Sequence, residues 1–416
     1  MPEKAYPVNQ LNISAKQRHL SKLTQIFKCY GDIDAKYFKK FYQLDCKNPF
    51  LETLSRLPMP DDVCDVFNGS VNGKALYSKI SSDFKSFTNK INKNDIELMS
   101  KSCPACHHVQ IINKQLYLVQ QKSPSYETRS RSSKMLLKEV VDTFENIPDL
   151  EMFLDLLNLN ELNGVKFNVP IFGLTKSTER LSQYFHSDGI ILMPCFSFWS
   201  WPEPRLGRWR NKLETVPQIA EKIQFQERTN SVFWRGAPTG ERQWFSMLSK
   251  KNQSILDIEF IQWSNVNIIM LNYAGSYKTI EEHCQYKYLL HQEGYSYSSR
   301  LKYLLLCRSV VIFAQFNGWE EYWYPLLEHK DNIVIFKDNG NETTFYNLLQ
   351  YLFDNQKKAE SIGKKGQELV QTYLNEQAVI CYMRNLLIEY SKLFNYTPTV
   401  HSMAIKIDDF ILSSNP

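Results

Sequence analysis

The fold is decided by residues 282–325, which read EHCQYKYLLHQEGYSYSSRLKYLLLCRSVVIFAQFNGWEEYWYP. An extended, aromatic-rich run opens this stretch, and a turn is expected around Gly294. A cluster of hydroxyl side chains then leads to Arg300, which opens an apolar run with helical spacing at residues 301–306. A β-branched run at residues 310–313 closes the unit. The order of these patterns predicts a strand, a turn, a helix and a second strand.

The junction between that first strand and the helix has the composition of a phosphate-binding site. It brings Gly294 and Arg300 together with three hydroxyls, those of Ser296, Ser298 and Ser299. Backbone N–H groups in the first turn of a helix lack partners, the helix dipole favours an anion there, and an arginine adds a forked contact. The same residues also fit an ordinary serine N-cap followed by a surface arginine. Both interpretations stay open on this pattern alone.

A second junction of the same kind lies upstream, at residues 231–242, SVFWRGAPTGER. A strand is expected to end there, a loop turns at Gly236, and a helix follows. Ligands of open parallel sheets bind beyond the carboxyl ends of the strands. Arg235 and Arg242 would therefore face Arg300, and a diphosphate would lie between the two loops.

Strands and helices alternate from about residue 150 onward, which is typical of an α/β domain. Within this region the segment FSFWSWPEP, residues 196–204, crowds aromatic residues beside prolines and an acid. Because apolar faces of sugars stack on aromatic rings, the segment predicts one wall of a sugar-binding cleft. A hydrophobic seam between domains fits the same residues, and both can hold at once. The candidate substrate-binding residues are Trp199, Trp201, Glu203 and Arg208.

Composition limits the classes of partner. The 416 residues are 43% hydrophobic, enough for a large core and for two or three domains. The 49 basic and 44 acidic residues interleave and give a net charge of only +5, so no nucleic-acid partner is expected. No run of about 18 apolar residues occurs, so no transmembrane segment is expected. Peripheral contact with a membrane stays compatible with this sequence.

The nine cysteines are scattered without the spacing of a disulfide framework. We therefore expect free thiols in a reducing compartment, and the lack of an apolar secretory segment near the amino terminus favours the cytoplasm. The segment CPACHH at residues 103–108 matches half of a zinc site or a haem-attachment sequence, but no second pair of ligands follows it. Neither this segment nor the Asp-x-Asp at residues 32–34 is expected to bind a metal.

Taken together, these residues resemble the Rumi-type protein O-glucosyltransferases, a family that includes capsule xylosyltransferases and bacterial lipopolysaccharide-modifying transferases. The resemblance covers roughly residues 105–395, and the aromatic segment is closer to the bacterial branch. The motifs that carry it are His283-Cys-x-Tyr-Lys-Tyr-Leu289, Gly294, Ser298 with Arg300-x-Lys302, Trp319 with Glu321 and Tyr324-Pro325, Arg235-Gly236 with Glu241-Arg242, and Gly207-Arg208-Trp209.

The resemblance implies an α/β architecture of the GT-B type, with two Rossmann-like halves facing each other across a cleft. It also implies inverting transfer of glucose or xylose from a UDP-sugar to a hydroxyl of a glycan or protein, with no metal and no cofactor. The expected parts are a helical extension at residues 1–100, an acceptor-side half at 101–225, a UDP-sugar half at 226–375, a helix packing back on the first half at 376–396, and a tail at 397–416.

The resemblance also implies roles for individual residues. Arg242 and Arg300 fall on the family's phosphate-contacting arginines, where fixed positive charge stabilises a leaving diphosphate. The other donor-binding residues expected around them are Arg235, Gly236, Gly294 and Ser298, with Glu321 at the ribose hydroxyls.

One position departs from the family. The family's aspartate base falls on Asn158, and an amide cannot accept the acceptor's proton at neutral pH. Asp155 or Glu161 after a shift in register, or another acid such as Asp188 or Glu203, would have to replace it. Asp155 lies three positions before Asn158 and would point to the opposite face of a continuing strand. The alternative is a protein that binds a nucleotide sugar and transfers it weakly or not at all.

Overall fold

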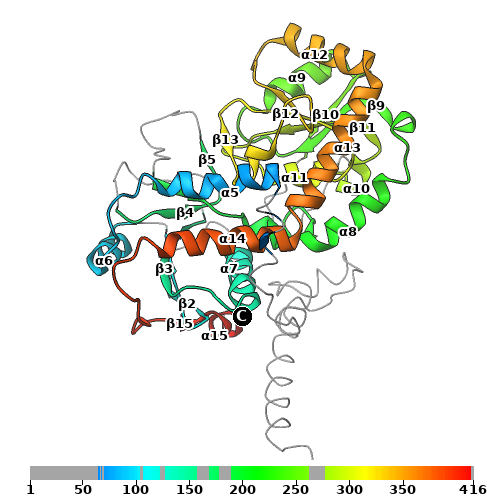
Figure 1. Ribbon diagram of the computed structural model, residues 1–416. Coiled ribbons are helices and arrows are strands. Elements are labelled where there is room, and N and C mark those ends of the chain that lie inside the picture. The colour runs from blue at the N-terminus through cyan, green and yellow to red at the C-terminus, as the bar shows by residue number, and fades with distance from the viewer. Residues whose placement is uncertain are drawn as a thin grey trace, which may run out of the picture.

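The computed structural model describes residues 64–65, 67, 70–103, 106–121, 127–156, 168–177, 189–261 and 277–413. Asn158, at the family's base position, and the candidate bases Glu161 and Asp188 lie outside these residues, as does the Asp-x-Asp at residues 32–34. The described chain forms two α/β halves, each built around its own sheet (Figure 1).

The first half contains a six-stranded sheet in the order β15-β2-β1-β3-β4-β6. Its first hairpin is antiparallel, and β1 also pairs antiparallel with β3, whereas β3, β4 and β6 run parallel. The parallel part is thus confined to one side of the sheet. The strands are β1 (His107–Ile112), β2 (Gln115–Gln120), β3 (Leu150–Asp155), β4 (Ile171–Gly173), β6 (Ile190–Leu192) and β15 (Ile405–Lys406).

The second half contains a five-stranded sheet in the order β10-β9-β11-β12-β14, and all its neighbouring strands are parallel. The strand, turn, helix and strand predicted for residues 286–313 are confirmed as β11, α11 and β12. The strands are β9 (Thr229–Gly236), β10 (Leu256–Phe260), β11 (Tyr286–Gln292), β12 (Val310–Ala314) and β14 (Val334–Phe336).

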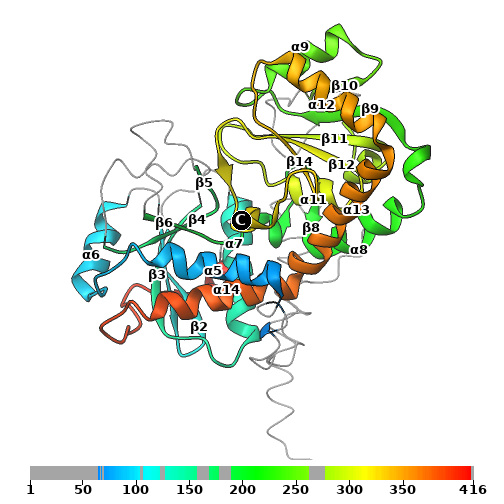
Figure 2. The same cartoon turned by 45° about the horizontal axis from the view of Figure 1, so that its top comes forward.

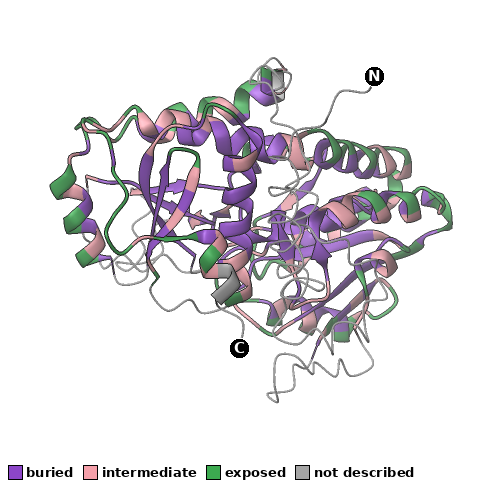
Figure 3. Cartoon of the chain, turned by 90° about the horizontal axis from the view of Figure 1, so that it is seen from below, coloured by how far each residue is buried: buried purple, intermediate pink, exposed green. Residues whose placement is uncertain are grey.

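The helices cover the two sheets, and their outward faces are the exposed surface while the strands are buried (Figure 3). They are α5 (Val71–Phe84), α6 (Lys93–Ser102), α7 (Glu127–Thr143), α8 (Trp209–Ala220), α9 (Gln243–Lys251), α10 (Ile280–His283), α11 (Leu301–Leu305), α12 (Glu342–Asp354), α13 (Gln356–Tyr373), α14 (Glu376–Ser391) and α15 (Ile407–Ser413). Among the described residues, none of these helices has the length and hydropathy to cross a bilayer.

The chain crosses back to the first half near its end. Helix α14 lies beside α5 and packs against α7, as the two views in Figures 1 and 2 agree. The tail then adds β15 to the edge of the first sheet, where Ile405 pairs with Leu118. Residues 405–406 of the expected tail therefore form an edge strand of the first sheet.

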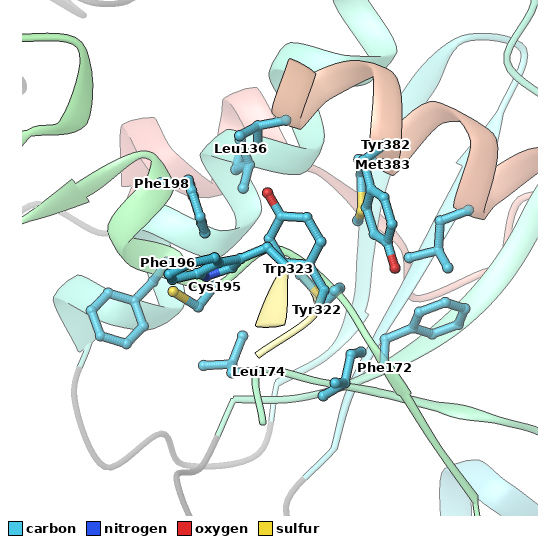
Figure 4. Packing of buried hydrophobic residues seen from close by; sticks show 14 of the residues in the cluster. Leu136, Phe172, Leu174, Cys195, Phe196, Phe198, Tyr322, Trp323, Tyr382 and Met383 are labelled. Atoms are coloured by element: carbon cyan, nitrogen blue, oxygen red, sulfur yellow. The ribbon is translucent and has the colours of Figure 1, made fainter. Parts of the chain in front are cut away.

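A single hydrophobic cluster joins the two halves. It contains residues of the first sheet, of the 3₁₀ turn η3 (Phe196–Phe198), and of the segment around Tyr322 and Trp323 in the second half. Figure 4 shows Phe196 and Phe198 beside these two aromatic residues, with Tyr382 of α14 on the other side. Because the core is continuous, the wall that each half contributes to the space between them is fixed relative to the other.

The expectation of free thiols is wrong for the cysteines that pair in the structure. Among the described residues, three disulfides form, Cys64–Cys381, Cys103–Cys106 and Cys284–Cys307, and Cys195 is the one cysteine that stays free. Spacing in the sequence does not show the first pair, because Cys64 and Cys381 are 317 positions apart and meet only through tertiary packing.

Candidate active site

A cavity of about 600 Å³ lies between the two halves, within the size range of small-molecule sites. The first half contributes Arg129, Phe196, Trp201, Glu203, Pro204 and Leu206. The second half contributes a larger wall from the ends of its strands and the segment before β11. That wall comprises Arg235, Gly236, Ala237, Thr239, Arg242, Ile261, Tyr277, Lys278, Ile280, His283, Gly294, Tyr295, Ser296, Tyr297, Ser298, Ser299 and Arg300.

The two predicted junctions are neighbours in the second sheet. Strands β9 and β11 are parallel partners, so the loops that follow them lie at the same edge of the sheet. Each loop ends in an arginine at the N-cap position of the next helix, Arg242 before α9 and Arg300 before α11. The structure thus brings the two arginines that were expected to bind phosphate to one cavity wall.

The two guanidinium groups converge. The central carbon of Arg242 lies 5.6 Å from the centre of the Trp234 ring, and that of Arg300 lies 5.4 Å from the same ring. Burial lowers the pKa of Arg242 to about 10, and burial followed by the charge of Arg242 lowers the pKa of Arg300 to about 9. Both groups are still protonated at neutral pH, so two positive charges share a partly dehydrated wall.

Backbone carbonyls hold these arginines in place. Arg242 donates from Nε to the carbonyl of Glu293 at 2.7 Å and from Nη2 to that of Gln292 at 3.2 Å, so it ties the first loop to the second. Arg300 donates from Nη1 to the carbonyl of Arg235. No carboxylate of the described chain contributes to the pKa shift of either group. Their charge is therefore offered to the cavity.

Arg235 differs from the other two. Its Nη2 pairs with Asp257 at 2.6 Å, and its Nε lies 3.6 Å from Glu259, both on the adjacent strand β10. The expectation that Arg235 assists with phosphate is therefore not supported by its contacts, although it lines the cavity. Two carboxylates already compensate its charge.

Glycine allows the two loops to approach each other. Gly240 has a φ of +62°, and a Cβ there would lie 2.2 Å from the carbonyl oxygen of Gly294. Gly294 donates its N–H to the carbonyl of Ser296 at 2.7 Å, which closes the second loop. Gly236, Gly294 and Ser298 all line the cavity with the arginines.

The wall of the first half carries an anchored acid. Glu203 accepts a hydrogen bond from Thr128 Oγ1 at 2.6 Å and lies 3.5 Å from Arg129 Nε. The Arg129 guanidinium is 5.0 Å from the centre of the Phe196 ring. Trp201 lies on the same wall. Glu203 is the only carboxylate lining the cavity among the residues that the structure describes.

Trp199 and Arg208 are not part of that wall. Both are buried, and the Arg208 guanidinium stacks on the Trp199 ring at 3.4 Å. For these two residues the hydrophobic-seam interpretation is correct, because their side chains pack in the interior beside the cavity.

Glu321 also lies behind the cavity. It is 0% exposed and accepts a hydrogen bond from Cys195 Sγ at 3.1 Å. Burial raises its pKa, and the buried amine of Lys302 opposes that shift. The expected contact with ribose hydroxyls is not available to a side chain in this position.

Asp155 ends β3, where it pairs in register with Gly173, and it is buried. It is not among the residues lining the cavity. In its described position it does not face the space in which an acceptor hydroxyl would bind.

Arg129, Tyr277 and His283 also line the cavity, although the sequence indicated no role for them. His283 belonged to the motif that carried the family resemblance, but nothing in that motif showed that its ring would face the cavity. No group of three or more potential metal ligands occurs within the described ranges.

Comparison with known proteins places the chain in a family. Residues 70–414 match the profile of Glycosyl transferase family 90, which extends the resemblance beyond the expected limits of 105 and 395. Protein O-glucosyltransferase 1 of Rattus norvegicus is 28% identical over 304 residues, which cover 70% of this chain and 74% of that protein. O-glucosyltransferase rumi of Drosophila melanogaster is 27% identical over 263 residues, covering 60% of this chain and 62% of that protein.

Solved structures give a more distant likeness. HepE of Anabaena in complex with UDP-glucose is 11% identical, covers 56% of this chain and 65% of its own, and has a TM-score of 0.35. The family profile, by contrast, spans both halves of the structure and the cavity between them. The chain therefore belongs to glycosyl transferase family 90.

Proposed function

We propose that this enzyme transfers glucose or xylose from a UDP-sugar to a hydroxyl group of a glycan or protein, with inversion and without a metal. One observation carries the proposal: Arg242 and Arg300 converge over one indole ring, and no carboxylate of the described chain compensates them. A diphosphate provides the charge that such a pair requires. The names of the two animal relatives, both O-glucosyltransferases, support a glucosyl donor.

In the proposed step, the acceptor oxygen forms a bond to the anomeric carbon as the bond from that carbon to the diphosphate breaks. The electron pair of the broken bond leaves with UDP, so negative charge grows on the diphosphate in the transition state. Fixed guanidinium groups stabilise that charge without reorganising, and this is the form of electrostatic catalysis with the largest effects. Their fork geometry suits phosphate oxygens.

The same step releases a proton from the acceptor hydroxyl. We propose Glu203 as the base that takes it, since it is the carboxylate in the described wall, whereas Asp155 is buried and does not line the cavity. Thr128 and Arg129 fix its orientation. Phe196 and Trp201 offer apolar ring surface to a sugar on the same side.

Titration of UDP into the wild-type protein by calorimetry tests the donor site. We expect Arg242→Ala and Arg300→Ala each to weaken UDP binding by at least about tenfold, because each removes charge-assisted hydrogen bonds. Lys251→Ala is the matched control, since it removes a positive charge from an exposed pair with Glu342. Wild-type affinity in both arginine variants would refute the donor site.

The base is tested by turnover of UDP-glucose and UDP-xylose in the presence of saccharide acceptors. We expect Glu203→Gln to lower kcat by about a hundredfold or more with UDP affinity unchanged. An unaffected Glu203→Gln together with an inactive Asp155→Asn would assign the base to Asp155. Tight UDP binding by a wild-type protein that transfers to no acceptor would instead favour the non-catalytic binding protein.

Equal rates of sugar transfer with and without a chelator are expected for metal-independent transfer.

The place of action is also a proposal. The cytoplasm was expected from the cysteine spacing, but the three disulfides favour an oxidising compartment, where such bonds persist. Alkylation of the protein taken directly from cells, followed by mass spectrometry, distinguishes the cytoplasm from an oxidising compartment. Paired Cys64 and Cys381 would support the oxidising compartment, and alkylated thiols at both positions would support the cytoplasm.

A further inference from the structure

His283 is held rigidly in the wall of the cavity. It ends α10, lines the cavity and is only 3% exposed. Its Nδ1 lies 2.6 Å from the backbone carbonyl oxygen of Thr279, and its ring meets the Phe233 ring edge-on at a centroid distance of 4.8 Å. These two contacts fix both the position and the rotation of the imidazole.

The contact with Thr279 also fixes the tautomer. A carbonyl oxygen can only accept, so the hydrogen of this bond must be on Nδ1. Burial, reinforced by the charge of Arg300, lowers the pKa of His283 to about 3, so the ring is neutral at pH 7. A neutral imidazole with its hydrogen on Nδ1 has a lone pair at Nε2. The residue therefore presents a hydrogen-bond acceptor.

That acceptor has no partner within the described part of the chain, although the atom is buried. Other buried atoms of the same wall, among them Ser296 Oγ and Arg300 Nε, are also without a partner among the described residues. Buried polar atoms in proteins are nearly always satisfied, because leaving one unpaired costs free energy. Several such atoms on one cavity wall indicate a ligand that supplies their partners.

We propose that Nε2 of His283 accepts a hydrogen bond from an N–H or O–H group of the sugar nucleotide. The inference rests on the proposed function and adds a specificity residue to it. An ionised diphosphate has only acceptor oxygens and would repel this lone pair, so the partner belongs to the uracil ring or to a sugar hydroxyl. His283 thus selects ligands that carry a hydrogen-bond donor, while the arginines select ligands by negative charge.

Two substitutions separate recognition from folding. Asparagine places an amide nitrogen near the position of Nδ1, so His283→Asn keeps a donor for Thr279 and loses the acceptor. Glutamine reaches the position of Nε2, so His283→Gln keeps an acceptor and loses the contact with Thr279. We expect His283→Asn to unfold near the wild-type temperature and to bind its ligand about three- to tenfold more weakly, the loss of one hydrogen bond. We expect His283→Gln to unfold at a lower temperature yet bind more tightly than His283→Asn.

Calorimetric titrations with UDP, CDP and UDP-glucose identify the partner group. Weaker binding of UDP by His283→Asn, with loss of any preference for UDP over CDP, assigns the bond to uracil N3–H, which cytosine lacks. Unchanged UDP binding with weaker UDP-glucose binding assigns it to a hydroxyl of the glucose moiety. If all three affinities equal those of the wild type in His283→Asn, or fall only as the unfolding temperature falls, the inference is overturned.

The arginine variants keep this result separate from the donor-site proposal. Suppose that the wild type binds UDP, that Arg300→Ala abolishes this binding, and that His283→Asn binds like the wild type. This result would refute the role of His283 and leave the donor-site proposal standing. Wild-type protein that binds neither UDP nor UDP-glucose would refute both.

Discussion

At the scale of the residue, the three arginines on the second half's wall of the cavity differ in whether a carboxylate or a backbone carbonyl holds the side chain. Arg235 is compensated by Asp257 and Glu259 on the neighbouring strand. Arg242 and Arg300 are instead held by backbone carbonyls, which orient a guanidinium without cancelling its charge. Three arginines that look equivalent in the sequence therefore divide into one that joins strands, Arg235, and two that we propose bind an anion, Arg242 and Arg300.

Replacing Arg300 by lysine tests whether geometry matters in addition to charge. Lysine keeps the charge but replaces a planar fork by a single ammonium group. We expect UDP affinity to fall about tenfold, measured by calorimetry, with an unfolding temperature close to that of the wild type. Equal affinity of the two proteins would show that a point charge is sufficient.

Buried neutral histidines predict acid sensitivity. Burial is the main cause that lowers the pKa of both His107 and His283 to about 3, from an unfolded value of about 6.5. Between these values the unfolded chain binds protons that the folded chain does not, so the free energy of unfolding falls as pH falls through this window. Each histidine contributes up to about 1.4 kcal/mol per pH unit. Urea unfolding between pH 7 and pH 5 should show a shallower dependence in His107→Phe, and an identical slope would contradict this assignment.

At the scale of the element, the donor site depends on how closely two loops approach. The loop before α9 and the loop before α11 meet at Gly240 and Gly294, which have no side chains to separate them. Arg242 then bridges the loops by donating to the carbonyls of Gln292 and Glu293. The elements themselves are ordinary strand-to-helix turns, and their contact is what creates the wall.

Gly240→Ala tests this contact, with Gly340→Ala as its matched control. Both glycines have positive φ, +62° and +82°, but a Cβ at Gly340 has nothing within 4 Å, whereas one at Gly240 would meet the Gly294 carbonyl at 2.2 Å. The control variant should lose only the stability that the strained left-handed backbone costs a residue with a Cβ, about 1–2 kcal/mol. Gly240→Ala should lose more stability in urea unfolding and should also weaken UDP binding. Equal loss in the two variants, with UDP binding intact, would argue against the contact.

At the scale of the whole molecule, the two ends of the described chain close the structure. Cys64 precedes α5 and Cys381 lies within α14, so their disulfide joins the segment before α5 to the helix that packs beside α5. The hydrophobic cluster that includes these helices continues into the second half. Loss of this disulfide, which we call the Cys64–Cys381 clamp, should therefore affect the stability of the molecule more than the chemistry in the cavity.

The double variant Cys64→Ser with Cys381→Ser measures the clamp. Removal of a disulfide that encloses a long loop is expected to cost about 2–5 kcal/mol. Denaturant unfolding should show this loss, while UDP affinity of the folded variant should match the wild type. Added reductant should lower the stability of the wild type further than that of the variant. A wild type insensitive to reductant would mean that the clamp is not a disulfide in solution.

Local pattern in the sequence was enough to predict the elements around the cavity, although not the edge strand β15. The run from Tyr286 to Ala314 specified a strand, a turn, a helix and a strand because each depends on neighbouring residues. The glycine and arginine positions placed Arg242 and Arg300 at the ligand-facing ends of strands for the same reason. The tertiary structure alone decided which groups are compensated, buried or paired. Asp257 neutralises Arg235, the interior encloses Glu321, Cys381 meets Cys64, and the carbonyl of Thr279 holds Nδ1 of His283. Burial and charge pairing depend on residues far apart in the chain, so no local spacing could have shown them.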